Sequence, residues 1–263
     1  HLETDLFCTF GVQANSARVI ASAHAAGKPA VLMIGSDGDL DARYTPTSRY
    51  VSQYGDDARV CHWMIQQADT IVTQTTQQKQ LLQERFGRTS AVLANPFDLA
   101  DWDRRKGTPL PPELRGGLQR YALWVGRAEP LHKRPQLLLE VARRCPDVSF
   151  LMVLNPREAA LEQQIRQTRP ANLQIVSSVS RALMPALFNR AAVFVSTSAL
   201  EGFPNVFLEA AAAGVPIASL DVGEEFLRDA AAGEYAAGDI DRLSEFVRRC
   251  WQAPSPGAGI ARR

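Results

Sequence analysis

The stretch Val193-Phe-Val-Ser-Thr-Ser-Ala-Leu-Glu-Gly-Phe-Pro-Asn-Val-Phe-Leu-Glu209, continued by Ala210-Ala-Ala-Ala-Gly-Val-Pro216, decides the fold. Its first five residues are β-branched, aromatic or small, which is typical of a strand. Pro204 suits the first turn of a helix, and Gly214 followed by Pro216 suits its end. The alanines between them allow close packing on a sheet. We therefore expect a strand, a loop and a short buried helix.

This stretch carries two carboxylates eight positions apart, one expected in the loop and one inside the helix. Glu201 alone has a simple structural explanation, because an acid near a helix N-terminus is stabilised by the helix dipole. Glu209 is harder to explain, because the surrounding helix is apolar and an unpaired buried carboxylate is costly. Helix N-termini bind anions, and carboxylates accept hydrogen bonds from hydroxyls. The pattern therefore predicts a ligand that carries both phosphate and sugar hydroxyl groups.

A second charged segment lies upstream, in Trp124-Val-Gly-Arg-Ala-Glu-Pro-Leu-His-Lys-Arg-Pro135. A strand is expected to end at Gly126 and a helix to begin near Pro135, which leaves a basic loop between them. Ligands of open α/β sheets bind outside the carboxyl ends of the strands. Arg127 offers a planar fork and Lys133 a mobile point charge, a pair suited to a diphosphate. Taken alone, this segment is explained by a solvated basic loop. Together with the Glu201–Glu209 stretch in the same half of the chain, it favours a diphosphate-binding site.

Outward from these segments, strand and helix patterns alternate along nearly the whole chain, which predicts an α/β fold. The first series has strands at 6–10, 30–35, 70–75 and 91–94, and helices at 14–26, 58–68 and 77–86. The second has strands at 121–126, 150–154, 173–176, 192–197 and 215–220, and helices at 135–144, 157–168, 182–190 and 241–251, besides the helix after Glu201. Pro and Gly residues at 106–112 form a linker. The predicted domains are residues 1–107, residues 108–250 and a flexible tail, 251–263. The first domain has fewer strands than a complete doubly wound unit and is expected to be incomplete.

Bulk composition excludes several classes of function. The chain has 263 residues, 46% of them hydrophobic, and a formal charge of +1, which gives no reason to expect nucleic acid as a partner. Its four cysteines are scattered without metal-ligand spacing and are expected to be reduced thiols. No apolar run is long enough to span a bilayer, and no signal peptide pattern opens the chain. Asp39-Leu-Asp41 has the spacing of a metal motif, but its place in a loop after a short Gly-rich turn favours an ordinary loop role instead.

Taken together, the two charged segments resemble the donor-site signature of the family 4 retaining glycosyltransferases. The residues concerned are Gly126-Arg127, Lys133-Arg134-Pro135, Glu201-Gly202-Phe203-Pro204-Asn205 and Glu209, with further similarity at 68–75, 95–98 and 210–216. The resemblance covers most of residues 5–250. It implies a GT-B type fold, in which two Rossmann-like, doubly wound parallel-sheet domains face a cleft, here with the first domain incomplete.

The resemblance also implies roles for individual residues. Arg127 and Lys133 would hold the donor diphosphate and stabilise the charge that builds on it, and together with Glu201 they form the expected catalytic set. Glu209 would accept hydrogen bonds from the ribose. The remaining donor-binding residues would be Gly126, Val179 next to the nucleobase, and Gly202, Phe203, Pro204 and Asn205 at the sugar and distal phosphate.

One position departs from the family pattern. Many relatives have a histidine before the glycine that ends the strand at 30–35, and this chain has Ile34 there. Ser36 and Asp37 are therefore the candidates for contacts on the acceptor side. His132 lies in the phosphate loop, where an ordinary structural role is the simpler interpretation.

The expected function is transfer of a sugar from a nucleoside-diphosphate sugar, of UDP or GDP type, to a hydroxyl of a glycan or lipid-linked acceptor. The family mechanism retains the anomeric configuration and needs neither a metal nor a cofactor. A cytoplasmic location is expected, and peripheral contact with the inner face of the membrane is compatible with it. The alternatives are a sugar-nucleotide epimerase, a GT-B phosphorylase and a non-catalytic nucleotide-sugar-binding subunit. A dehydrogenase is disfavoured because no Gly-x-Gly-x-x-Gly follows an early strand.

Overall fold

A computed structural model describes residues 4–52, 54–115 and 119–253. The chain divides into two compact units. The first unit comprises residues 1–96 together with Glu201–Phe203, and the second comprises 97–200 and 204–263. Most of the predicted tail, residues 254–263, lies outside the described residues.

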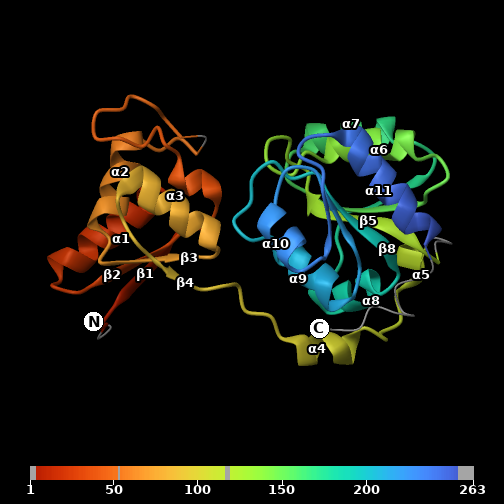
Figure 1. Ribbon diagram of the computed structural model, residues 1–263, viewed down its shortest axis with the longest axis horizontal. Coiled ribbons are helices and arrows are strands. Elements are labelled where there is room, and N and C mark those ends of the chain that lie inside the picture. The colour runs from red at the N-terminus through yellow and green to blue at the C-terminus, as the bar shows by residue number, and fades with distance from the viewer. Residues whose placement is uncertain (1–3, 53, 116–118, 254–263) are drawn as a thin grey trace. The chain divides into compact units, whose positions relative to one another are not determined.

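The first unit is a four-stranded parallel sheet with helices packed on one face (Figure 1). Its strands are β1 (Phe7–Phe10), β2 (Ala30–Met33), β3 (Thr70–Thr73) and β4 (Ala91–Val92), in that order across the sheet. Its helices are α1 (Ala14–Ala25), α2 (Ala58–Gln67) and α3 (Thr76–Phe86), with a short 3₁₀ turn, η1 (Asp37–Leu40), after β2. Ile20, Leu32 and Met64 are fully buried between the helices and the sheet. The four predicted strands are all present, each shorter than the apolar run that predicted it.

The second unit is a six-stranded parallel sheet. Its strands are β5 (Tyr121–Arg127), β6 (Phe150–Asn155), β7 (Leu173–Val176), β8 (Ala191–Ser196), β9 (Ile217–Ser219) and β10 (Gly233–Tyr235). The order across the sheet is β10-β9-β8-β5-β6-β7. The chain therefore starts at the centre with β5, winds outward to β7, and then returns to wind the other way from β8. This reversal places a topological switch point between β5 and β8, which is where ligands bind in doubly wound sheets.

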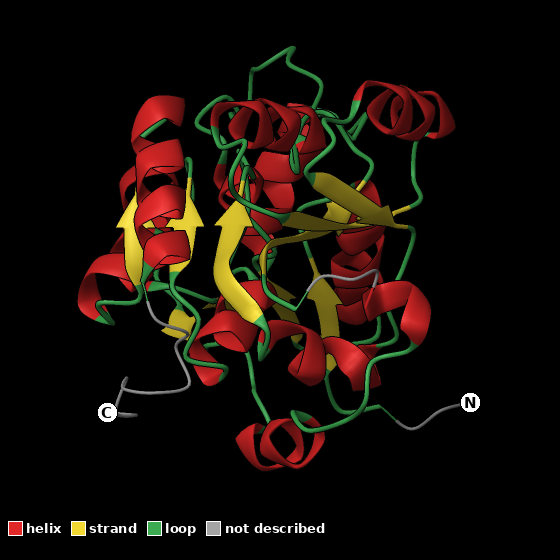
Figure 2. Ribbon diagram, turned by 90° about the vertical axis from the view of Figure 1, so that its right-hand side faces the viewer, coloured by secondary structure: helices red, strands yellow, loops and turns green. Residues whose placement is uncertain are grey.

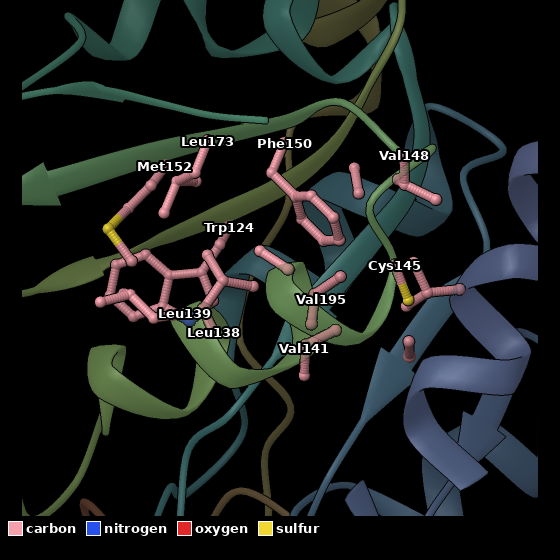
Figure 3. Packing of buried hydrophobic residues seen from close by; sticks show 14 of the residues in the cluster. Trp124, Leu138, Leu139, Val141, Cys145, Val148, Phe150, Met152, Leu173 and Val195 are labelled. Carbon is pink, nitrogen blue, oxygen red and sulfur yellow. The ribbon is translucent and has the colours of Figure 1, made fainter. Parts of the chain in front are cut away.

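Helices cover both faces of this second sheet (Figure 2). They are α6 (Pro135–Arg144), α7 (Ala159–Thr168), α8 (Met184–Phe188), α9 (Asn205–Ala212), α10 (Glu224–Asp229) and α11 (Ile240–Gln252). On one face, Trp124 and Phe150 pack with Leu138 and Leu139 of α6 (Figure 3). On the other, Phe194 packs against other aromatic rings, including that of Phe207. Because the strands are buried on both faces, they read as continuous apolar runs.

The structure adds elements that the sequence did not predict. The sixth strand, β10, was missed because Gly233-Glu-Tyr235 is a short, half-buried edge with little strand character. Three helices were also missed: α4 (Leu99–Arg105), α5 (Pro112–Arg115) and α10. The start of α4 is fixed by Asp98, whose carboxylate accepts the N–H of Asp101 at 2.8 Å. The helix predicted over 182–190 is instead a 3₁₀ turn, η2 (Arg181–Leu183), followed by the short α8.

Candidate functional site

The candidate site lies at the carboxyl edge of the second sheet, around the switch point. Each of the six strands of this sheet ends at this edge, and four of the connections that follow are 128–134 after β5, 177–180 after β7, 197–204 after β8 and 220–223 after β9. Parallel strands bring all four to the same edge. The two charged segments singled out by the sequence are the connections after β5 and β8, and β5 and β8 are neighbouring strands. The second unit thus brings them together.

The connection after β5 is folded around the carboxylate of Glu129. Its oxygens accept the backbone N–H groups of Leu131 and His132, both at 2.9 Å, and of Lys133 at 3.2 Å. Burial pushes the pKa of the Glu129 carboxyl upward, but these three donors outweigh it, so the pKa lies below its usual range. The ionised carboxylate fixes the backbone from which Lys133 projects. The role of Glu129 was not predicted from the sequence.

Thr197 joins this connection to the one after β8. Its hydroxyl donates to the carbonyl of Lys133 at 2.7 Å and accepts the indole N–H of Trp124 at 2.9 Å. The N–H of Ala199 donates to the carbonyl of His132 at 2.7 Å. Thr197 is completely buried, so the two bonds of its hydroxyl are shielded from water. The backbone around Lys133 is therefore bonded to the start of the next connection.

The two predicted cations differ in their surroundings. Arg127 is the last residue of β5, and it is exposed. Lys133 is half-buried and lies just before α6. Gly126, which was predicted beside them, is buried within β5. Both charges thus stand at the edge of the sheet where an anion would bind.

Helix α9 begins and ends almost as the sequence predicted. Pro204 is its N-cap residue rather than a residue of the first turn, and it supplies no side-chain cap for the helical N–H groups. Asn205, the first helical residue, is exposed. The N-terminus of this eight-residue helix lies at the same edge of the sheet as the cations.

Glu209 holds an unsatisfied carboxylate oxygen. Its Oε2 atom is buried and has no hydrogen-bond partner among the residues that the structure describes. Burial raises the pKa of Glu209 to about 7, although the positive charge of Arg181 acts in the opposite direction. A buried polar atom without a partner costs free energy unless a ligand supplies a donor. The arrangement fits a ligand hydroxyl at this oxygen.

The remaining predicted residues lie in three places. Val179 is half-buried in the connection after β7, next to Arg181 in the chain, and packs against the apolar cluster around Phe207. Glu201, Gly202 and Phe203 follow β8 in the chain and are grouped with the first unit. The second unit therefore places seven predicted residues at or next to one sheet edge: Gly126, Arg127, Lys133, Val179, Pro204, Asn205 and Glu209. Glu201, Gly202 and Phe203 are not among them, because they belong to the first unit.

In the first unit, Ser36 and Asp37 follow β2 at the carboxyl edge of its sheet. Burial raises the pKa of Asp37, whose carboxylate accepts a hydrogen bond from the amide of Gln78 at 3.1 Å. Ile34 is fully buried in the core. Asp39 accepts the N–H groups of Gly35 and Ser36, at 2.7 and 3.3 Å, and so stabilises the loop in which it lies.

Two further observations bear on cofactors and membranes. Among the residues that the structure describes, no three His, Cys, Asp or Glu side chains gather closely enough to hold a metal ion. Within the same residues, no helix is both long and apolar enough to cross a bilayer. All four cysteines are free thiols, as expected.

Known proteins resemble the chain in both sequence and structure. The sequence model of the glycosyl transferases of group 1 matches residues 119–253. A D-inositol 3-phosphate glycosyltransferase of Mycolicibacterium paratuberculosis is 30% identical over 150 residues, which are 53% of this chain and 34% of that protein. A glycogen synthase of Mycobacterium tuberculosis is 27% identical over 213 residues, 76% of this chain and 50% of the relative. The chain thus spans between a third and a half of the curated relatives it matches.

Among solved structures, a UDP-forming α,α-trehalose-phosphate synthase from Burkholderia xenovorans, in complex with glucose-6-phosphate, has a TM-score of 0.70 at 15% identity. The match covers 97% of this chain and 68% of that structure. The fold is therefore that of the GT-B glycosyltransferases, with two parallel sheets and a switch point in the second. The family match covers just over half of the sequence, and the chain belongs to the glycosyl transferases of group 1.

Proposed function

We propose that the chain binds a nucleoside-diphosphate sugar in its second unit and takes part in transfer of the sugar to a hydroxyl acceptor. The observation that carries the proposal is the buried, unpartnered Oε2 of Glu209, on the helix that follows the switch point. A ribose hydroxyl would donate to this oxygen and satisfy it. A nucleoside-diphosphate sugar carries both groups that the site suits: a ribose hydroxyl for Glu209 and a diphosphate for Arg127 and Lys133.

In this proposal Arg127 and Lys133 bind the diphosphate. As the glycosidic bond breaks, negative charge grows on the leaving phosphate, and cations held in place beforehand stabilise it without reorganisation. Gly126, Pro204 and Asn205 contribute backbone around the phosphates. Val179 borders the nucleobase.

The sugar and acceptor subsites belong to the same proposal. Glu201, Gly202 and Phe203 would contact the donor sugar, and Ser36 and Asp37 the acceptor. The reaction would retain the anomeric configuration and proceed without a metal, the leaving phosphate helping to deprotonate the acceptor hydroxyl. The acceptor would be a glycan or a lipid-linked sugar, which fits a cytoplasmic enzyme in peripheral contact with a membrane.

Similar proteins support a UDP donor. The trehalose-phosphate synthases are described as UDP-forming, and other structures of this fold are described as complexes with UDP. The curated relatives are a glycosyltransferase and a glycogen synthase, so transfer to a hydroxyl is the reaction class that the proposal favours.

The test is calorimetric titration of the chain with UDP-, GDP- and ADP-sugars in the presence of EDTA. We expect one nucleotide to bind selectively, and Glu209→Gln to weaken nucleotide-sugar binding more than binding of inorganic diphosphate. Glu245→Gln is the matched control, because Glu245 is an exposed residue of α11. Equal losses for both ligands would contradict the ribose assignment. No binding of any nucleotide sugar by the wild-type chain would overturn the proposal.

A further inference from the structure

Arg134 has an unusual backbone conformation for an arginine. Its φ is 46° and its ψ is 54°, in the left-handed region, where it forms the N-cap of α6. This conformation is strained for residues with a Cβ and is natural for glycine. Strain of this kind persists only where surrounding contacts over-determine it. The contacts of the side chain identify what holds it.

One guanidinium joins three connections of the second unit. Its Nε donates to the carbonyl of Thr197 at 2.7 Å and its Nη2 to the carbonyl of Ser198 at 3.1 Å, both in the connection after β8. Nη2 also pairs with the carboxylate of Asp221, in the connection after β9. The two side chains are 22% and 29% exposed, so the ion pair is largely shielded from solvent.

The backbone of Arg134 is held as firmly as its side chain. Its N–H donates to the carbonyl of Glu129 at 3.1 Å, which closes the turn that contains Lys133. Beside it, the Thr197 hydroxyl donates to the Lys133 carbonyl. The carbonyl of Lys133 is thus bonded to the connection after β8, and the next residue, Arg134, is bonded to that connection and to the one after β9.

We propose that Arg134 is a positioning residue that sets the backbone of Lys133 against the start of the connection after β8, and so preorganises the diphosphate site. The inference rests on the proposed function, because it assigns a use to the diphosphate-binding loop. A charged group contributes fully to binding and catalysis only when its support keeps it in place before the ligand arrives. Arg134 does not itself touch the ligand in this proposal.

The test compares Arg134→Gly with Ala231→Gly. Ala231 also has a φ of 46°, but it is exposed and its side chain ends at Cβ, so its replacement relieves the same strain without removing a clamp. Arg134→Gly should fold, because glycine adopts this conformation freely. Amide hydrogen exchange is measured first, without any ligand. We expect faster exchange at Ala199 and at 131–134 in Arg134→Gly only, because the bonds between the two connections loosen.

Binding of inorganic diphosphate is measured next, by calorimetry. We expect affinity to fall between roughly tenfold and a hundredfold in Arg134→Gly, the scale produced by a displaced charged group, and to stay at the wild-type value in Ala231→Gly. Asp221→Asn, which removes only the ion pair, should give a smaller loss. Millimolar methylguanidinium, compared with sodium chloride at equal ionic strength, should restore part of the affinity of Arg134→Gly by occupying the vacated site.

The outcomes separate the two proposals. If the wild-type chain binds diphosphate and Arg134→Gly binds it equally well, the positioning role is wrong and the proposed function stands. A loss of affinity that methylguanidinium does not restore, or that Ala231→Gly shares, also overturns the positioning role. If the wild-type chain binds neither diphosphate nor any nucleotide sugar, the proposed function fails and this inference fails with it.

Discussion

The indole of Trp124 lies over the Cα of Gly126, two residues further along β5 on the same face of the strand. A Cβ placed on Gly126 would stand 2.5 Å from Cη2 and 2.8 Å from Cζ2 of that ring. The ring cannot move away freely, because it is 2% exposed and its N–H is bonded to the buried hydroxyl of Thr197. Gly126 is therefore required by the packing of its own strand, apart from any contact with a ligand.

Gly126→Ala should therefore destabilise the second unit. Overpacking of a tight core costs about 1–3 kcal/mol, and displacement of the indole would also strain the bond to Thr197. Urea unfolding followed by tryptophan fluorescence measures the change. Gly107→Ala is the control, since a Cβ there meets no atom within 4 Å. Unchanged stability in Gly126→Ala would contradict the packing described for Trp124.

Glu209 should make stability depend on pH in a known direction. Its pKa is about 7 in the folded chain and 4.5 in the ordinary, unfolded case. The folded state therefore holds the proton more tightly, and stability falls as pH rises from about 4.5 to about 7. Glu209→Gln cannot ionise, so at about pH 8 it should be more stable than wild type by about 3 kcal/mol, and nearly equal to it below about pH 4.5. Urea midpoints of both proteins across this range provide the measurement. A constant difference between them would show that the carboxyl is not buried as described.

The same group should make donor binding depend on pH. A ribose hydroxyl donates to the ionised carboxylate, so binding favours loss of the proton from Glu209. Nucleotide-sugar affinity should rise with pH, by up to about tenfold per unit, until about pH 7 and then level off. Nucleotide sugars suit this titration because their diphosphate, a diester, carries no proton that leaves in this range. A flat profile in Glu209→Gln and a rising one in wild type are expected; the same rise in both would assign the effect to another group.

Arg127 and Lys133 should matter more for turnover than for binding of the intact donor, because the charge on the leaving phosphate grows in the transition state. Free diphosphate already carries that charge, so its binding depends on both cations. With the donor selected by calorimetry, Arg127→Ala should lower kcat on the order of 10²-fold and weaken donor binding much less. Arg169→Ala is the matched control: Arg169 is exposed and precedes β7, at the opposite edge of the sheet. Equal losses in kcat and in affinity would mean that Arg127 binds the ground state and the transition state alike.

Lys133→Ala should likewise lower turnover, and EDTA should leave the wild-type rate unchanged. Under the proposed mechanism, the two cations do the work that a divalent metal does elsewhere. Lys79→Ala, at an exposed position of α3, is the control for loss of a lysine charge. Strong inhibition by EDTA, reversed by added magnesium, would contradict the metal-free mechanism.

Most of the fold could be predicted because buried parallel strands are short, continuous apolar runs. Phe150–Asn155 and Ala191–Ser196 are of this kind, and their ends were predicted to within a residue or two. Edge and connecting elements carry no such signal. Within the residues that the structure describes, Gly233–Tyr235 pairs with β9 alone and is half-buried, so its strand character comes from its partner rather than from its residues.

The candidate site could be predicted only where a charge contrasts with its local sequence. Glu209 is such a case, a carboxylate within an apolar helix. Arg134 was noticed only as part of a basic loop, because its partners Thr197, Ser198 and Asp221 are between 63 and 87 residues away in the chain. No periodicity or spacing reports a contact of that kind. Glu129 was missed for the opposite reason: its partners are its immediate neighbours, and a loop acid bonded to its own backbone leaves no pattern.

The order of the strands gives a ligand-binding switch point to the second sheet and none to the described part of the first. The first sheet is laid down strictly in sequence, β1-β2-β3-β4, so that within the described residues its winding never changes direction. Each connection in the first sheet leads to the adjacent strand, so the helices that follow neighbouring strands lie on the same face. In the second sheet, the neighbouring strands β5 and β8 are followed by helices on opposite faces. A nucleotide would therefore have a single place to lie in the described part of this chain. Under the proposed function, changes to the loops of the first sheet would alter which acceptor receives the sugar and leave donor binding intact.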